Sequence, residues 1–437
     1  MTLVIAMQNA IVFGVNLADS IMLGMYSEAA LSGVFLVNQI QFLLQMMVNG
    51  VGEAMLIFAS RSWGERDIPG IHKYTNLGMR FALLFSCLIF AVCFIFPEGC
   101  LRIFSDSEAF VSEGAKYLRI VCFTYPIFAI TNTIIYMLRS VETTKIGFYV
   151  SIFALFFNVI LNYVLIFGKF GFPELGVVGA AIATLVSRIA ELVFAVVYAW
   201  KADKKVKIKL SAFFEKIEFK MLKDFVRTGF PVFLSGAAWG VAMSVQTAIL
   251  GHMGDTAVSA NSIATTLFQI TTVFTYGSAS ASAVVIGKAL GEGKKDKMKP
   301  YAQSMQIMFL IIGLITGLLI FVLKEPIVSL YDVTEESASM ALSFLTILSV
   351  TSIGTSYQMP VLTGIVRAGG ETDFVFKNDF IFMWLIVIPA AVICGFFLHL
   401  SPIVVFICLK SDQILKCAVA VVKVNRYKWI REINSQK

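Results

Sequence analysis

The sequence has 437 residues, of which 58% are hydrophobic and 14% charged, with a formal net charge of +7 and a mean hydropathy of +0.82. So few polar residues cannot cover a water-soluble globule, so the composition predicts a protein that is solvated by lipid. The basic residues are spread over the breaks between apolar runs, which indicates membrane topology and excludes a nucleic-acid partner.

About twelve apolar runs follow one another along the chain, each long enough for a bilayer core of roughly 30 Å. The expected spans are 2–24, 31–59, 76–97, 117–138, 146–168, 177–200, 229–252, 258–286, 303–324, 340–364, 376–397 and 401–422. The first run lacks the charged start and cleavage site of a signal peptide, so we expect a true span, with a few residues preceding it. The sequence therefore predicts an all-α, multi-pass protein of the cell (inner) membrane.

Lysine and arginine gather in every second break, which fixes the expected orientation. One set of breaks holds Arg61, Arg66, Lys73, Arg139, Lys145 and the cluster at 288–299, whereas the other set is almost free of basic residues. The positive-inside rule then places the basic breaks and both termini in the cytoplasm. The longest break, 201–227, contains the amphipathic piece EKIEFKMLKDFV, which we expect to lie along the lipid headgroups.

Three segments return after about 227 residues, which indicates a duplication. Residues 20–34 match 247–261, 60–67 match 287–294, and 138–144 match 366–372 with a shift of one residue. Six spans per repeat give two parallel six-helix lobes with a substrate cavity between them. The expected domains are an N-terminal lobe (1–200), a basic cytoplasmic linker (201–228), a C-terminal lobe (229–425) and a cytoplasmic tail (426–437).

The duplication, the string NLADSIMLG around Asp19, and the run FNVILNYVLIFGKFGFPELGVVGAAIATLVSR at 157–188 resemble the multidrug and toxic compound extrusion (MATE) family of transporters, bacterial type. The motifs LRSVETT and RAGGET, at the ends of the fourth and tenth spans, add support. The resemblance covers essentially the whole chain. It implies twelve helices in two lobes, and export of organic, often cationic or amphipathic, compounds in exchange for H⁺ or Na⁺.

In one branch of this family the coupling ion binds to an Asp in helix 1, an Asn and an Asp four residues apart in helix 5, and a Thr in helix 6. By resemblance these roles fall on Asp19, Asn158, Asn162 and Thr184, with an amide at Asn162 in place of the second carboxylate. Another branch has acids in helices 7 and 10, but the spans 229–252 and 340–364 contain none, which argues against a C-lobe ion site.

The residues themselves support an ion site at Asp19. Insertion of a carboxylate at bilayer depth costs roughly 2.5 to 3.5 kcal/mol, so Asp19 requires partners or a proton. The equivalent residue in the second repeat is the uncharged Gln246. Asn158 and Asn162 lie one turn apart on the same helix face, where their carbonyl oxygens can converge on one cation. The alternative reading is structural: Asn16 or Ser20 satisfies Asp19, and the two amides bridge helices.

Polar and aromatic residues inside the spans suggest the substrate cavity. The candidates are Gln39, Asn132, Tyr136, Trp239, Gln246, Gln269, Tyr276 and Tyr357. Aromatic faces can hold flat cations, although aromatic residues at helical spacing more often pack. Glu53 either lines the cytoplasmic entrance or pairs with Arg61, and Arg188 is expected to pair with Glu191.

Other functions are less consistent with the sequence. A lipid-linked glycan flippase of related fold is the main alternative, but it would need a cationic lumen, and the relevant spans hold few basic residues. An intramembrane enzyme would need a His or Cys constellation, whereas the seven cysteines lack paired spacing and His72, His252 and His399 lie in breaks or at span ends. No P-loop occurs. We therefore expect no enzyme activity, no cofactor, no metal beyond a Na⁺ at the coupling site, and a monomer whose partners are small organic molecules and lipid.

Overall fold

The computed structural model describes residues 2–104, 107–202, 205–206, 217–329, 331 and 333–430. Every regular element within these ranges is a helix. The chain divides into two compact units: the N-unit, Met7–Phe233, and the C-unit, which combines Met1–Ala6 with Leu234–Lys437. The lobe, linker and tail boundaries expected from the sequence stay predictions.

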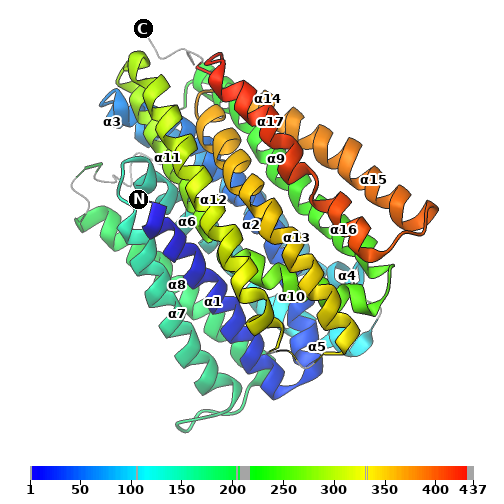
Figure 1. Ribbon diagram of the computed structural model, residues 1–437. Coiled ribbons are helices and arrows are strands. Elements are labelled where there is room, and N and C mark those ends of the chain that lie inside the picture. Colours follow the sequence, from blue (N-terminus) through cyan, green and yellow to red (C-terminus); the bar gives the residue numbers. More distant parts are fainter. Residues whose placement is uncertain are drawn as a thin grey trace. The chain divides into compact units, whose positions relative to one another are not determined.

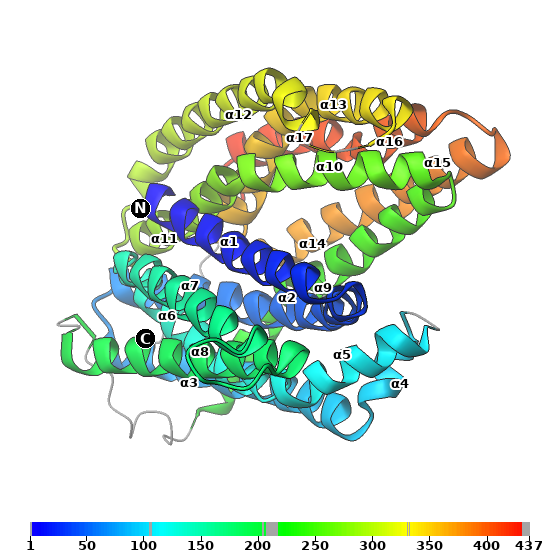
Figure 2. The same cartoon turned by 90° about the horizontal axis from the view of Figure 1, so that it is seen from below.

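The N-unit holds the first half of the helices, and α7 and α8 pack side by side within it (Figure 1). Its elements are α1 (Thr2–Tyr26, of which residues 2–6 belong to the C-unit), α2 (Glu28–Gly64), α3 (Ile68–Ile95), α4 (Pro97–Arg102), α5 (Glu108–Val121), α6 (Thr124–Ser140), α7 (Lys145–Ile166), α8 (Gly176–Val197) and the π-helical turn η1 (Tyr198–Ala202). Helices α4 and α5, cyan in Figure 2, contact each other.

The C-unit holds the second half, and α12 and α13 run alongside each other there (Figure 1). Its elements are α9 (Phe219–Gly251, which starts in the N-unit), α10 (Asp255–Thr271), α11 (Val273–Gly291), η3 (Lys295–Lys297), α12 (Met298–Val328), α13 (Glu335–Met359), η4 (Pro360–Val366), α14 (Thr372–Phe380), η5 (Ile381–Val387), α15 (Ile388–Val392), η6 (Ile393–Phe397), α16 (Pro402–Lys410) and α17 (Asp412–Asn425). Segments η4, η5 and η6 are π-helical.

Within the described residues, nine helices are long and apolar enough to cross a membrane, and a tenth span results if α5 and α6, bent by 52°, count as one. The remaining expected spans, 2–24 and 401–422, correspond to the continuous helix α1 and to the pair α16 and α17. The expected span 258–286 is divided between α10 and α11, and 401–422 between α16 and α17 at Ser411. The other expected spans each overlap one observed helix, helix pair or continuous run of helical segments, in the same order along the chain. The agreement arises because a spanning helix needs a long apolar run, which hydropathy detects.

The start of α9 differs from expectation. Instead of a separate interfacial piece, residues 219–226 form the first turns of a 33-residue helix that continues through the expected seventh span. Phe225 is buried there and lies 5.7 Å from the ring of Phe58 and 5.8 Å from that of Phe81. Apolar packing therefore joins these turns to the N-unit. Residues 207–216 of the predicted linker lie outside the described part of the chain.

Small residues allow close helix approach in the N-unit. A Cβ on Gly33 of α2 would lie 2.6 Å from the backbone nitrogen of Gly114 in α5, and a Cβ on Gly114 would lie 2.8 Å from the Gly33 carbonyl oxygen. Backbone therefore meets backbone at this crossing. Such contacts matter in lipid, where association depends on close van der Waals packing more than on the hydrophobic effect.

The beginning of the predicted tail packs against the C-unit. Trp429 is fully buried, and its indole nitrogen donates to the Val424 carbonyl oxygen at 2.8 Å. A Cβ on Gly369 would lie 2.4 Å from the Trp429 ring, so only glycine fits beneath it. Lys423 pairs with Glu371 at 3.3 Å. The chain up to residue 430 is thus part of the folded C-unit.

Candidate functional site

Asp19 on α1 and the two amides on α7 form a connected polar group inside the N-unit. The Asn162 side-chain nitrogen donates to the Asp19 carboxylate at 2.5 Å and to the Asn158 carbonyl oxygen at 3.1 Å. Asn158 and Asn162 are both buried, with exposures of 2% and 0%. The structure thus brings together the three residues that the sequence placed on spans one and five.

The side-chain carbonyl oxygen of Asn162 is buried and accepts no hydrogen bond. A buried acceptor without a partner costs about 1 to 3 kcal/mol and calls for an explanation such as an unfilled ligand position. Here the unpartnered oxygen belongs to Asn162, whose amide nitrogen donates to Asp19. The Asn162 oxygen can therefore accept a further hydrogen bond, or bind a cation, beside the Asp19 carboxylate.

Thr184, the fourth predicted ligand, is buried on α8, and its hydroxyl lies 3.5 Å from that of Tyr117 on α5. Tyr117 is also within electrostatic range of Asp19. Tyr117 was not among the predicted site residues, because an isolated tyrosine in an apolar run gives no sign of which helix it faces. Thr184 therefore adjoins the Asp19 group through Tyr117.

Arg188 on α8 forms the predicted ion pair with Glu191, at 2.7 Å, and lies over the Phe128 ring at 5.6 Å. It also interacts electrostatically with Asp19 and Tyr117. The ion pair between Arg188 and Glu191 was expected, whereas the electrostatic interaction of Arg188 with Asp19 was not. The side chains of Asn16 and Ser20, the alternative partners of Asp19, lie outside the described part of the structure.

The N-unit candidates for the substrate cavity differ in their surroundings. Asn132 donates to the Asn49 side chain at 3.1 Å, and Gln39 is partly buried. Tyr136 is 7% exposed, with the Arg139 guanidinium 4.7 Å from its ring centre. Tyr136 is thus buried within the unit, in contact with Arg139.

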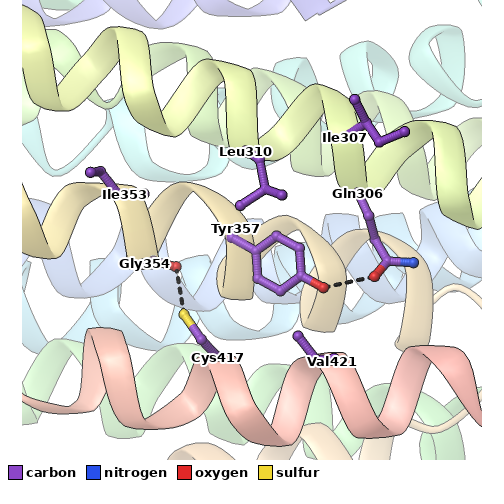
Figure 3. Close-up of a pocket in the computed structure, with 8 residues that line it drawn as sticks. All are labelled: Gln306, Ile307, Leu310, Ile353, Gly354, Tyr357, Cys417 and Val421. Atoms are coloured by element: carbon purple, nitrogen blue, oxygen red, sulfur yellow. Dashed lines mark hydrogen bonds between the residues drawn. The ribbon is translucent and has the colours of Figure 1, made fainter.

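Among the C-unit candidates, Trp239, Gln269 and Tyr276 are exposed, whereas Gln246 and Tyr357 are buried. Tyr357 lines a mostly apolar cavity of about 300 Å³ between α12, α13 and α17 (Figure 3). Its hydroxyl donates to the side-chain oxygen of Gln306 at 2.7 Å. Gln246 accepts from the Lys410 ammonium at 3.1 Å. A role in substrate binding stays a prediction for all eight candidates.

The last two spans contain four charged residues for which mutual pairing is the simplest expectation. The structure pairs Lys416 with Asp379 and Asp412, each at 3.1 Å. Lys410 does not join them. The seven cysteines are free thiols, and the described residues contain no group of three or more His, Cys, Asp or Glu that could hold a metal.

Comparisons with known proteins agree with the fold. A family model described as MatE matches residues 5–164 and 231–393. The chain is 23% identical over 415 residues to a probable multidrug resistance protein NorM of Thermotoga maritima, covering 95% of this chain and 88% of that protein. It is 25% identical over 396 residues to the multidrug resistance protein NorM of Vibrio cholerae, covering 87% and 83%.

Solved structures share the architecture at low identity. A crystal structure of MATE in complex with MaL6 has a TM-score of 0.88 and 21% identity, covering 98% of this chain and 94% of that one. A transporter of the MOP superfamily from Pyrococcus furiosus has a TM-score of 0.88 and 20% identity over the same shares. The fold is therefore that of twelve helices in two lobes. Because the family model matches both halves of the sequence, the chain belongs to the MatE family, the multidrug and toxic compound extrusion transporters.

Proposed function

We propose that this protein is a secondary antiporter that exports organic, often cationic or amphipathic, compounds across the cell membrane in exchange for H⁺ or Na⁺. Asp19, Asn158, Asn162 and Thr184 form its coupling site. The observation that carries the proposal is the contact between the partly buried Asp19 and the buried Asn162, together with the unpartnered Asn162 oxygen. The names of the relatives, multidrug resistance proteins, support the substrate class.

Rotation of the Asn162 amide supplies a loading mechanism. In the present arrangement its NH₂ group donates to Asp19 and to Asn158, as an anionic carboxylate requires. Turning the amide by 180° about its last torsion directs its oxygen toward these two oxygen atoms instead. Oxygens of Asp19, Asn158 and Asn162 then face one point, which suits Na⁺, while a protonated Asp19 can donate to the Asn162 oxygen.

Binding of the coupling ion at Asp19 changes the strength of a contact between two helices. The contact joins α1 to α7, so its strength depends on whether Asp19 is an anion, a neutral acid or a cation ligand. A ligand that binds one helix arrangement better than the other shifts the population between them. Ion entry thereby biases the N-unit toward one arrangement, and substrate release accompanies the change.

One ion is sufficient to drive useful export. A single charge that crosses 100 mV provides about 2.3 kcal/mol, and roughly 1.4 kcal/mol corresponds to a tenfold concentration ratio. For a substrate without net charge, one ion per transport cycle therefore supports a gradient of roughly 50-fold at that potential. Exchange for a monovalent cation is electroneutral, so there the concentration gradient of the ion supplies the drive. No nucleotide hydrolysis is needed. We further propose that the transporter works as a monomer without a cofactor and that both termini are cytoplasmic.

The Asp19→Asn variant tests the coupling role. The variant keeps the shape of the side chain but has no titratable group, so we expect gradient-driven transport to be abolished. The measurement is ethidium or norfloxacin efflux from proteoliposomes under an imposed pH or Na⁺ gradient. Asp373→Asn, which neutralises an exposed acid of the C-unit, is the matched control and is expected to behave like the parent. Equal transport by Asp19→Asn and the parent would rule out Asp19 as the loading point.

A further inference from the structure

Lys410 lies inside the last apolar run and has no acidic partner among the residues that the structure describes. Its ammonium donates to the Gln246 carbonyl oxygen at 3.1 Å and lies 5.4 Å from the centre of the Phe406 ring. Among the described residues, no carboxylate lies within ion-pair distance of it. Asp412 acts on it electrostatically, but that carboxylate is paired with Lys416 at 3.1 Å.

An ammonium has three donors, and only one donates to an oxygen here. A charge at bilayer depth is costly unless it is paired or hydrated, and such residues usually mark a substrate or ion path. Trp384, which follows Met383 in the chain, has a buried indole nitrogen with no acceptor among the described residues. Trp384 packs against the same core as Met383 and Phe406. The remaining N–H groups of the Lys410 ammonium are donors, so a ligand at this ammonium is an acceptor.

The repeat explains why this position is of interest. Gln246 is the duplicate of Asp19, the loading residue proposed for the N-unit. The Gln246 amide nitrogen approaches the Met383 sulfur at 3.1 Å, and its oxygen faces Lys410. At this repeat position the N-unit has an acid, whereas the C-unit has a neutral amide that contacts a cation.

The surrounding backbone is irregular, which is common where spanning helices bind ligands. Met383 lies on the π-helical segment η5, and the helix break between α16 and α17 falls at Ser411, next to Lys410. The Ser411 hydroxyl donates to the Cys408 carbonyl oxygen at 2.7 Å, which satisfies one backbone group near the break.

We propose that Lys410 and Gln246 form an anion subsite in the C-unit that binds a carboxylate of the exported compound. The substrate carboxylate accepts from the Lys410 ammonium and from the amide nitrogen of Gln246. This inference rests on the proposed export function and narrows its substrate class to organic acids and zwitterions. Purely cationic compounds bind without this contact.

Equilibrium binding to the purified full-length protein in detergent, at pH 7.5 and without an ion gradient, tests the subsite. The probes are norfloxacin, which carries a carboxylate, and its methyl ester, which does not. A charge-assisted hydrogen bond is worth about 1.5 to 3 kcal/mol, so we expect the parent to prefer the acid by about tenfold or more. We expect Lys410→Met to bind acid and ester equally, and Lys410→Arg to keep the preference for the acid.

Lys377→Met removes an exposed lysine of the same unit and serves as the control, with parental selectivity expected. Equal affinity of the parent for acid and ester overturns the proposal, as does a selectivity that survives in Lys410→Met. Asp19→Asn is expected to keep the acid preference, because this assay has no coupled step. Failure of ion coupling and failure of the anion subsite are therefore separate results.

Discussion

Asn162 determines what the proposed coupling site can hold. In the family branch that the sequence resembles, a carboxylate stands at this position, whereas here the amide donates to Asp19. One acid with neutral oxygens around it suits a single monovalent cation. The amide at Asn162 therefore limits the proposed site to one negative charge, that of Asp19.

Asn162→Asp adds a second negative charge beside Asp19. Two neighbouring carboxylates attract a cation more strongly, so the concentration of coupling cation at half-maximal transport should fall by about tenfold or more. Proteoliposome transport at a series of Na⁺ concentrations and pH values measures this. Asn162→Leu is expected to abolish coupling. An unchanged cation dependence in Asn162→Asp would place the binding point elsewhere.

Arg188 neutralises the buried Glu191 in a partly buried pair next to the Asp19 group. Arg188→Met leaves the Glu191 carboxylate buried without its cation, which costs about 3 to 5 kcal/mol. We expect a lower thermal unfolding temperature in detergent. The double variant Arg188→Met/Glu191→Gln should recover most of the loss, and a double variant as unstable as the single would contradict the pairing argument.

At the scale of the elements, helix contacts depend on side-chain size at a few crossings. Where α2 meets α5, neither glycine has space for a Cβ, and the nearest atoms are backbone atoms that cannot rotate away. Apolar periodicity predicts these helices, but it does not show which glycines lie at a crossing, since the crossing angle and register are tertiary properties.

Gly33→Ala should therefore push α2 and α5 apart and lower the thermal unfolding temperature, by an amount typical of overpacking, about 1 to 3 kcal/mol. Gly14→Ala on α1 is the matched control, because nothing lies within 4 Å of its added Cβ, and alanine favours the helix. Thermal unfolding of the two purified variants makes the comparison. Equal stability would mean that the crossing relaxes at little cost.

At the scale of the whole molecule, the distribution of basic residues predicts the orientation in the membrane. Lys169 lies in a break that is poor in basic residues, whereas Lys299 belongs to the basic cluster 288–299. Both side chains are exposed. The two positions thus report on opposite predicted faces.

In a variant without native cysteines, we expect Lys169→Cys to react with a membrane-impermeant maleimide in intact cells. Lys299→Cys should react only after permeabilisation, because the positive-inside rule keeps basic breaks in the cytoplasm. The reverse labelling pattern would invert the predicted topology, and the parent without cysteines gives the background.

The sequence by itself determined the number and order of the apolar runs, the duplication and the position of the buried acid. These are local or periodic signals along one chain. Even the approach of Asp19 to Asn162, 143 residues apart, was predictable through the family resemblance.

The tertiary structure alone decided which neighbours complete each polar group. No periodic signal in the sequence marks Tyr117 and Arg188 near Asp19, Lys410 against Gln246, or Trp429 packed on Gly369. Gln246 and Lys410 are 164 residues apart, and their contact depends on which faces of α9 and α16 meet. Hydropathy specifies that a helix lies in lipid, but packing specifies its rotation and therefore the partners of its few polar side chains.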